Sequence, residues 1–241
     1  MDTDLLIQQS AEYVKTRTPD KETTGHDWHH IHRVWKTAKH IAKAEGADTV
    51  VTEIAALFHD IADWKFSGVD EGNAKIARQA LENFGAPENI ITKVCEIVDK
   101  VSYRGAGVAT TMESLEGKCV QDADRLDALG AIGIARCFAY GGLKNRPIYD
   151  PDNLPQQHKD FEAYKKSNGS SLNHFYEKLL LLKDRMQTDT GRKLAKKRHT
   201  FLQIFLDHFM IEWDCTETLE LIIDKGGNDG NPDLQGLRST V

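Results

Sequence analysis

Histidine and aspartate residues are concentrated in one part of this 241-residue sequence. Six of the ten histidines lie within residues 26–59. His59 is followed directly by Asp60, and apolar residues flank the pair, Phe58 before it and Ile61 after it. A carboxylate buried between apolar residues is costly unless a positive or hydrogen-bonding partner accompanies it. The pair therefore indicates a buried site that contains such a partner.

Two further segments place imidazole or carboxylate groups on faces that we expect to be buried. At about 100° per residue, His30 stacks one turn before Val34, on the apolar stripe of residues 28–45. Asp124 lies in a stripe of small apolar residues, and Asp127 shares its face. A single inward histidine is more often a hydrogen-bonded core residue than a ligand. Three helices that all point such groups inward need a common cation, which is either a divalent metal or an Arg or Lys side chain.

A divalent metal at this site would have two nitrogen and two oxygen ligands. That set suits a borderline or hard ion, and the lack of cysteine ligands disfavours a closed structural zinc site. Four protein ligands leave positions on a six-coordinate ion for water and a substrate oxygen. A bound water has a lowered pKa, and the ion offsets charge on a phosphoryl group under attack. The candidate ligands are His30, His59, Asp60 and Asp124.

The elements that must position these residues are helices. Apolar residues recur at helical spacing, and glycine and proline stand where the helices are expected to end. The sequence shows no strand alternation and no internal repeat. We expect helices over residues 5–18, 28–45, 48–58, 72–84, 87–102, 115–139, 156–166, 171–186 and 190–213.

Composition restricts the class of protein. No apolar run approaches the ~20 residues of a membrane span. The net charge of −6 (31 basic against 37 acidic residues) and the pI of about 5.9 argue against non-specific nucleic-acid binding. The four cysteines form no CxxC pair, and the acidic N-terminus lacks the basic region of a secretory signal. These features favour the reducing cytoplasm.

We therefore expect an all-α protein with a single globular helical domain and a disordered C-terminal tail. The domain covers residues 20–215, and an N-terminal helix within residues 1–19 packs on it. The polar, glycine-rich residues 224–241 form the flexible tail. We expect no membrane or nucleic-acid partner, and the sequence leaves the oligomeric state open.

The ordered candidate ligands resemble the H…HD…D signature of the HD-domain metal-dependent phosphohydrolases. The similarity extends over roughly residues 20–215, and it is clearest in residues 25–34, 57–65, 120–128 and 130–136. A single-domain subgroup that hydrolyses nucleoside triphosphates is the most similar. The resemblance implies an all-α HD-type fold and one divalent ion, with Mn²⁺ or Mg²⁺ favoured and Fe, Co, Ni or Zn possible. It implies that the ligands of this ion are His30, His59, Asp60 and Asp124.

The same resemblance implies an enzyme that cleaves (deoxy)nucleoside triphosphates to a monophosphate and pyrophosphate through a metal-activated water. Other HD proteins are 5′-nucleotidases, triphosphohydrolases, cyclic-nucleotide phosphodiesterases or (p)ppGpp hydrolases, so the motif fixes the chemistry better than the substrate. Two other interpretations stay open. One is a metal-dependent nucleotide-binding module without turnover, and the other is a structural protein whose buried His and Asp residues form internal hydrogen bonds.

Asp63 and Lys65, which follow the His-Asp pair in the sequence, are candidates for catalysis. Asp63 lies one turn after Asp60 and resembles the acidic residue that orients the attacking water in related nucleotidases. We expect it to act as a general acid/base or to orient water, the alternative being an exposed helix-end carboxylate. Lys65 is the second candidate, because a lysine there can stabilise the charge on phosphate oxygens.

Four residues are expected to bind the substrate or to position groups that do. His26, Arg33 and Lys65 can bind phosphate oxygens. Arg33 has an alternative, which is an ion pair with Asp27 or Asp60. Asp127 is the fourth, and it can anchor a ligand histidine or the basic group beside it.

Overall fold

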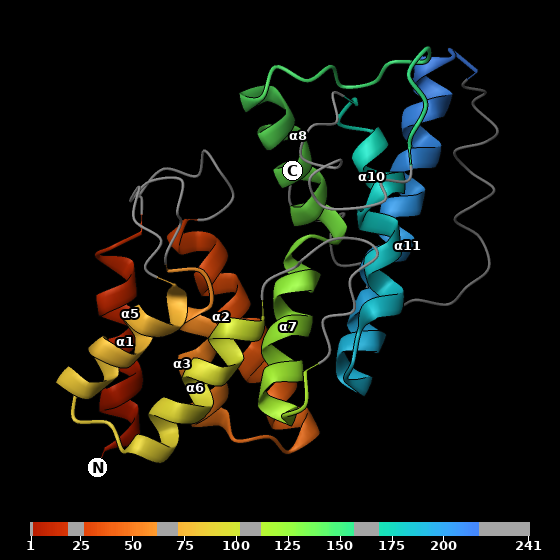
Figure 1. Cartoon of the computed structure of the whole chain (residues 1–241). Coiled ribbons are helices and arrows are strands. Elements are labelled where there is room, and N and C mark those ends of the chain that lie inside the picture. Colours follow the sequence, from red (N-terminus) through yellow and green to blue (C-terminus); the bar gives the residue numbers. More distant parts are fainter. Residues whose placement is uncertain (1, 19–26, 62–71, 102–111, 157–168, 217–241) are drawn as a thin grey trace, which may run out of the picture. The chain divides into compact units, whose positions relative to one another are not determined.

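A computed structural model describes residues 2–18, 27–61, 72–101, 112–156 and 169–216 (Figure 1). Within these ranges the chain forms helices and no strand, which confirms the all-α prediction. Most of the predicted helix over 156–166 and all of the predicted tail lie outside the described residues. Three predicted site residues lie outside them as well, namely His26, Asp63 and Lys65.

Five helices make up the first half of the described chain. Asp2, Asp27 and Asp48 begin three of them, and each accepts hydrogen bonds from backbone N–H groups of the first turn. One of these helices ends at Gly46, whose φ of 76° lies in the left-handed region that favours glycine. The five helices are α1 (Thr3–Lys15), α2 (Trp28–Glu45), α3 (Thr49–Phe58), α5 (Asn73–Asn83) and α6 (Glu88–Lys100).

Helix α3 is the buried helix of this group. Every residue from Val51 to Phe58 is buried, and α3 packs against α1, α2 and α6. Glu53 is the one charged residue in that stretch, and it accepts hydrogen bonds from Trp35 Nε1 at 2.8 Å and Lys39 Nζ at 3.0 Å, both on α2. Since His59 caps the C-terminus of α3, the helix delivers the His-Asp pair into the protein interior.

The long helix predicted over residues 115–139 is wrong, because two helices occupy that stretch. Helix α7 (Leu115–Asp127) ends before Leu129, whose backbone is extended, and α8 (Gly130–Leu143) begins at a glycine with a φ of 72°. A Cβ atom at Gly133 would collide with the carbonyl oxygen of Ala128. The two glycines therefore permit a sharp turn that the run of small apolar residues concealed.

The predicted helix over 171–186 is also interrupted. Its first part is α10 (Asn173–Glu177) and its second part is a 3₁₀ helix, η1 (Leu179–Arg185). The break falls at Lys178, where φ is −141° and ψ is −57°. Helix α11 (Asp189–Trp213) follows, and the buried Asp122 of α7 fixes its approach by accepting hydrogen bonds from Gln187 N and Thr188 N.

Internal contacts divide the chain into two compact units, residues 1–202 and 203–241. Within the described part of the second unit, Phe205, Phe209 and Trp213 follow one another at four-residue spacing. Their ring centroids are separated by 6.0 and 6.1 Å. All residues discussed below as a candidate site belong to the first unit.

No single described helix is long and apolar enough to cross a membrane. Helices α7 and α8, which meet at 63°, satisfy that criterion of length and composition only when they are taken together.

Candidate metal centre

Three helices bring the four predicted ligands together. The Nε2 atoms of His30 on α2 and His59 after α3 lie 3.5 and 3.8 Å from the same oxygen, Oδ1 of Asp124 on α7. One ligand atom from each of His30, His59 and Asp60 lies within 4.8 Å of the others. Atoms that bind one octahedral ion at roughly 2.1 Å lie about 3 Å apart when adjacent and about 4 Å apart when opposite. The spacing of these side chains is close to that range.

The imidazoles of this group are more deeply buried than the carboxylates. His30 and His59 are 2% and 4% exposed, whereas the Asp124 side chain is 28% exposed and Asp60 is half-buried. The apolar faces of α2 and α3 enclose the two rings. Among the described residues, the more exposed side of the group is therefore the carboxylate side.

His59 carries an orphaned lone pair. Its Nδ1 donates a hydrogen bond of 2.8 Å to the carbonyl oxygen of Ala56. A carbonyl only accepts, so the proton is on Nδ1 and the neutral ring has its lone pair on Nε2. That Nε2 is buried and has no hydrogen-bond partner among the described residues. An unsatisfied buried nitrogen costs free energy, and a cation in front of it would remove the cost, which fits a metal ion better than internal hydrogen bonding.

His30 is held in the same tautomer by a different partner. Its Nδ1 lies 2.7 Å from Oδ2 of Asp127, so the ring donates to the carboxylate and turns Nε2 toward Asp124. Burial lowers the pKa of His30, although the hydrogen bond to Asp127 opposes this effect. A neutral imidazole with a fixed Nε2 lone pair is the form that binds metals.

Asp127 also accepts hydrogen bonds from two guanidinium groups. Arg33 of α2 donates Nε to Oδ1 at 2.8 Å and Nη2 to Oδ2 at 3.1 Å, and Arg136 of α8 donates Nη1 to Oδ2 at 2.7 Å. Burial alone would raise the pKa of Asp127, but the hydrogen bonds from His30 and Arg33 outweigh it, so the pKa lies well below its usual value. The carboxylate stays ionised and aligns all three groups.

Asp127 contacts a candidate ligand histidine and a neighbouring arginine, and its anchoring role stays a prediction. The sequence offers Asp27 and Asp60 as partners for Arg33, whereas the structure shows Arg33 on Asp127. The sequence analysis does not predict a role for Arg136. The feature that could have indicated one is that Arg136 is the single charged residue in the apolar stretch 131–140. The roles of His26, Asp63 and Lys65 stay predictions, because those residues lie outside the described ranges.

Comparison with known proteins agrees with this arrangement. The family model described as HD domain matches residues 27–129, the segment that carries all four candidate ligands and Asp127. The protein YpgQ of Bacillus subtilis is 40% identical over 200 residues, which cover 83% of this chain and 89% of YpgQ. The chain belongs to the HD-domain superfamily. Arg136 of this HD-domain protein lies outside the matched segment.

Solved structures resemble the HD-domain protein over most of its length. The crystal structure of Bacillus subtilis YpgQ in complex with ADP is 35% identical, with a TM-score of 0.68 over 86% of this chain and 97% of that chain. The crystal structure of an HD-superfamily hydrolase from Bacillus thuringiensis is 41% identical, with a TM-score of 0.70 over 88% and 98% of the two chains. The HD-domain protein therefore has the fold of HD-superfamily hydrolases.

Proposed function

We propose that this HD-domain protein is a metal-dependent phosphohydrolase that cleaves (deoxy)nucleoside triphosphates to a monophosphate and pyrophosphate. The observation that carries the proposal is the buried Nε2 of His59, which has no hydrogen-bond partner among the described residues and faces a second imidazole and two carboxylates. We assign one divalent ion, Mn²⁺ or Mg²⁺, to His30, His59, Asp60 and Asp124. When bound, that ion would lower the pKa of a water ligand and offset the charge on the phosphoryl group.

The chain's own residues prepare the site for this reaction. His30 and His59 present lone pairs whose directions are fixed by hydrogen bonds on the opposite ring nitrogens. Asp127 holds the guanidinium groups of Arg33 and Arg136 next to His30, where they can bind phosphate oxygens. Positioned positive charges of this kind stabilise charge that develops during phosphoryl transfer without having to reorganise.

Residues beyond the described ranges complete the proposal. Asp63 is proposed to orient the attacking water or to exchange a proton with it, and His26 and Lys65 are proposed to bind phosphate oxygens. A nucleotide is favoured as the substrate because the related YpgQ forms a complex with ADP. The positive groups around Asp127 suit the several negative charges of a polyphosphate.

The test is to incubate the full-length protein with Mn²⁺ and dATP and to resolve the products. We expect dAMP and pyrophosphate in equal amounts. Release of orthophosphate without pyrophosphate would place the protein among triphosphohydrolases or 5′-nucleotidases instead. A lack of turnover of any phosphoester with Mn²⁺, Mg²⁺, Co²⁺, Ni²⁺, Zn²⁺ or Fe²⁺ would contradict the proposal, and tight nucleotide binding without turnover would indicate a binding module.

A further inference from the structure

The first half of α11 lies beside α7, the helix that carries two of the site carboxylates (Figure 1). Just before α11 begins, the backbone N–H of Thr188 donates to Oδ2 of Asp122 on α7 at 2.8 Å. Further along α11, Nη1 of Arg198 donates a hydrogen bond to the carbonyl oxygen of Leu126. These contacts follow the same order on both helices and lie within the first compact unit. Arg198 is therefore level with the last turn of α7.

The last turn of α7 is an unfavourable place for anions. The C-terminal end of a helix carries unpaired carbonyl groups and a partial negative charge. Asp124 and Asp127 add two carboxylates to that end. Arg136 of α8 donates Nη1 to the carbonyl oxygen of Asp127 at 3.2 Å, and Arg198 donates to the carbonyl oxygen immediately before it. Guanidinium groups from α8 and α11 thus offset the negative charge at this end of α7.

The aliphatic part of Arg198 packs at the turn between α7 and α8. A Cβ atom at Gly130 would stand 3.2 Å from both Cβ and Cγ of Arg198. Gly130 has a φ of 72°, so glycine suits both the backbone conformation and the close approach of the arginine. The Arg198 side chain is half-buried, which fixes its stem against the turn and its guanidinium group against the helix end.

We propose that Arg198 is a positioning residue of the metal centre. It holds the last turn of α7 so that Asp124 meets the ion and Asp127 meets His30. This inference rests on the proposed function, because it concerns the site to which the ion is assigned there. Arg198 lies outside residues 27–129, so a part of the chain that the HD family model does not match would set the affinity for the ion.

The test measures Mn²⁺ binding to the full-length protein by isothermal titration calorimetry. Arg198→Met keeps an aliphatic stem beside Gly130 but removes the donor and the charge, so the Kd for Mn²⁺ should rise about 3- to 10-fold. Arg198→Lys restores a charged donor and should return the Kd to within about twofold of the wild-type value. In saturating Mn²⁺ the kcat of Arg198→Met for dATP should fall less than about twofold, because the ion then occupies the same ligands.

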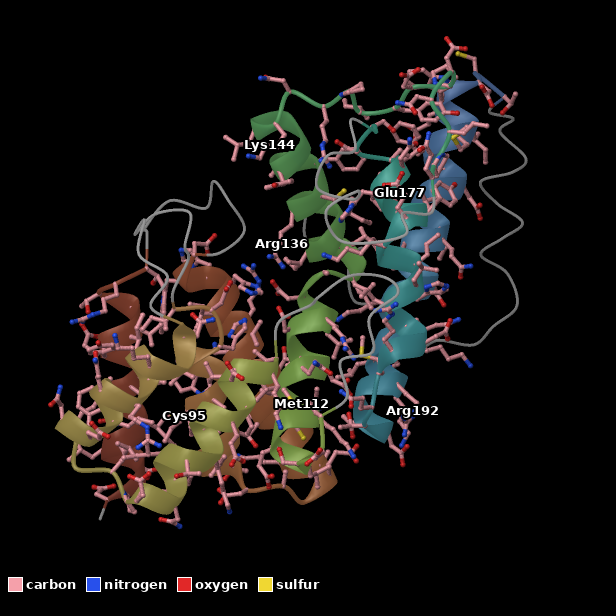
Figure 2. All side chains as sticks on the ribbon, in the orientation of Figure 1. Cys95, Met112, Arg136, Lys144, Glu177 and Arg192 are labelled. Atoms are coloured by element: carbon pink, nitrogen blue, oxygen red, sulfur yellow. The ribbon has the colours of Figure 1, made fainter. Side chains whose placement is uncertain are left out.

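Arg192→Met is the matched control. Arg192 lies near the start of α11 and donates to the carbonyl oxygen of Met186 at 3.1 Å and to Asp189 Oδ1, neither of which belongs to α7 (Figure 2 labels Arg192 and Arg136). The variant therefore removes the same group from the same helix, and it should leave the Kd for Mn²⁺ unchanged. If Arg198→Met loses its helical circular dichroism signal, Arg198→Gln gives the same comparison with a neutral polar side chain.

The outcomes separate this inference from the proposed function. An unchanged Kd in Arg198→Met, an equal change in Arg192→Met, or no recovery in Arg198→Lys would overturn the inference. Arg198-dependent Mn²⁺ binding in a protein that hydrolyses no nucleotide would support the inference and contradict the catalytic proposal. Hydrolysis of dATP with a Kd for Mn²⁺ that Arg198→Met leaves intact would do the reverse. A wild-type protein that binds no divalent ion would contradict both.

Discussion

Two regions of the chain supply side chains to the same site, and they are built differently. The ligand region consists of α2, α3 and α7, which are regular helices of ten residues or more. His30 and Asp124 lie on α2 and α7, and His59 and Asp60 follow the last turn of α3. The cationic region consists of α8, which begins after the turn at Gly130 and carries Arg136, and of α10, which ends at the break at Lys178. Regular helices fix the reaction centre through their rotational register, whereas the cations are placed by turns and by long-range packing.

Asp127 joins the two regions. One of its oxygens accepts hydrogen bonds from His30 of the ligand region and Arg136 of the cationic region, and the other accepts from Arg33. A buried carboxylate with so many donors is stable only while all of them are in place. The comparison therefore predicts that changes on the ligand side abolish chemistry, that changes at Asp127 affect both regions, and that changes on the cationic side alter selectivity or stability.

The largest effect is expected from removing a ligand. His59→Ala and Asp124→Ala should each abolish hydrolysis, by roughly 1,000-fold or more, because a catalytic metal contributes several kcal/mol to the transition state. Circular dichroism should show that the helices persist, and calorimetry with Mn²⁺ should show loss of binding. His40→Ala, on the exposed face of α2, is the control and should keep both properties. Full activity in His59→Ala would contradict the assignment of the centre.

Asp127→Asn should have the next largest effect. The amide keeps the shape of the side chain but cannot hold His30, Arg33 and Arg136 as an anion does, so Mn²⁺ affinity and kcat/KM should fall about 10- to 100-fold. Asp122→Asn is the matched control, because Asp122 is also buried on α7 but accepts from Gln187 and Thr188. It should lower the melting temperature and leave Mn²⁺ affinity unchanged. Equal losses of affinity in the two variants would mean that Asp127 has only a structural role.

The same contrast explains how much of the molecule the sequence predicted. Helical periodicity predicts that His30 and Asp124 lie on inward faces, and the structure brings the two side chains within 3.5 Å because α2 and α7 are regular over the relevant turns. Periodicity gives no distance between helices, so it could not predict that Arg33 of α2 pairs with Asp127 of α7. The all-α class followed from the same periodicity, since nearly every segment repeats at helical spacing.

The errors fall where a local backbone conformation overrides the side-chain pattern. Small apolar residues continue through 128–135, so the sequence predicts one helix, and only the φ of 72° at Gly130 reveals two. The break at Lys178 has no neighbouring glycine or proline from which it could be predicted. The contacts of Cys137 with Ser171 and of Phe138 with Phe175 join segments that are far apart in the sequence, which no single-segment pattern contains.

The turn between the two regions can be tested with glycine variants. Gly133→Ala would place a Cβ atom against the carbonyl oxygen of Ala128, so it should reduce the free energy of unfolding by about 1–3 kcal/mol. Gly142→Ala lies in the same helix with nothing within 4 Å of its Cβ, and it should be neutral or stabilising by up to about 1 kcal/mol. Urea unfolding measures both values. Equal stability of the two variants would show that the turn tolerates a side chain.

The smallest expected effect is a pH dependence that belongs to the cationic region. Burial lowers the pKa of His174 on α10 to about 3, with Lys178 and Arg146 adding to the effect. The unfolded chain, with an ordinary histidine pKa of about 6.5, binds a proton that the folded chain does not. The free energy of unfolding therefore falls as the pH drops from about 6.5 toward 3, and His174→Gln removes that contribution.

The loss of stability between pH 7 and pH 5 should be smaller in the variant by about 1 kcal/mol, since the ring is only half-buried. Urea unfolding at the two pH values measures the difference, and His40→Gln on the exposed face of α2 should not change it. If the free energy of unfolding of His174→Gln changed with pH as it does in the wild-type protein, the pKa of His174 would not be lowered by burial in the folded chain. The cationic region would then not differ electrostatically from the protein surface.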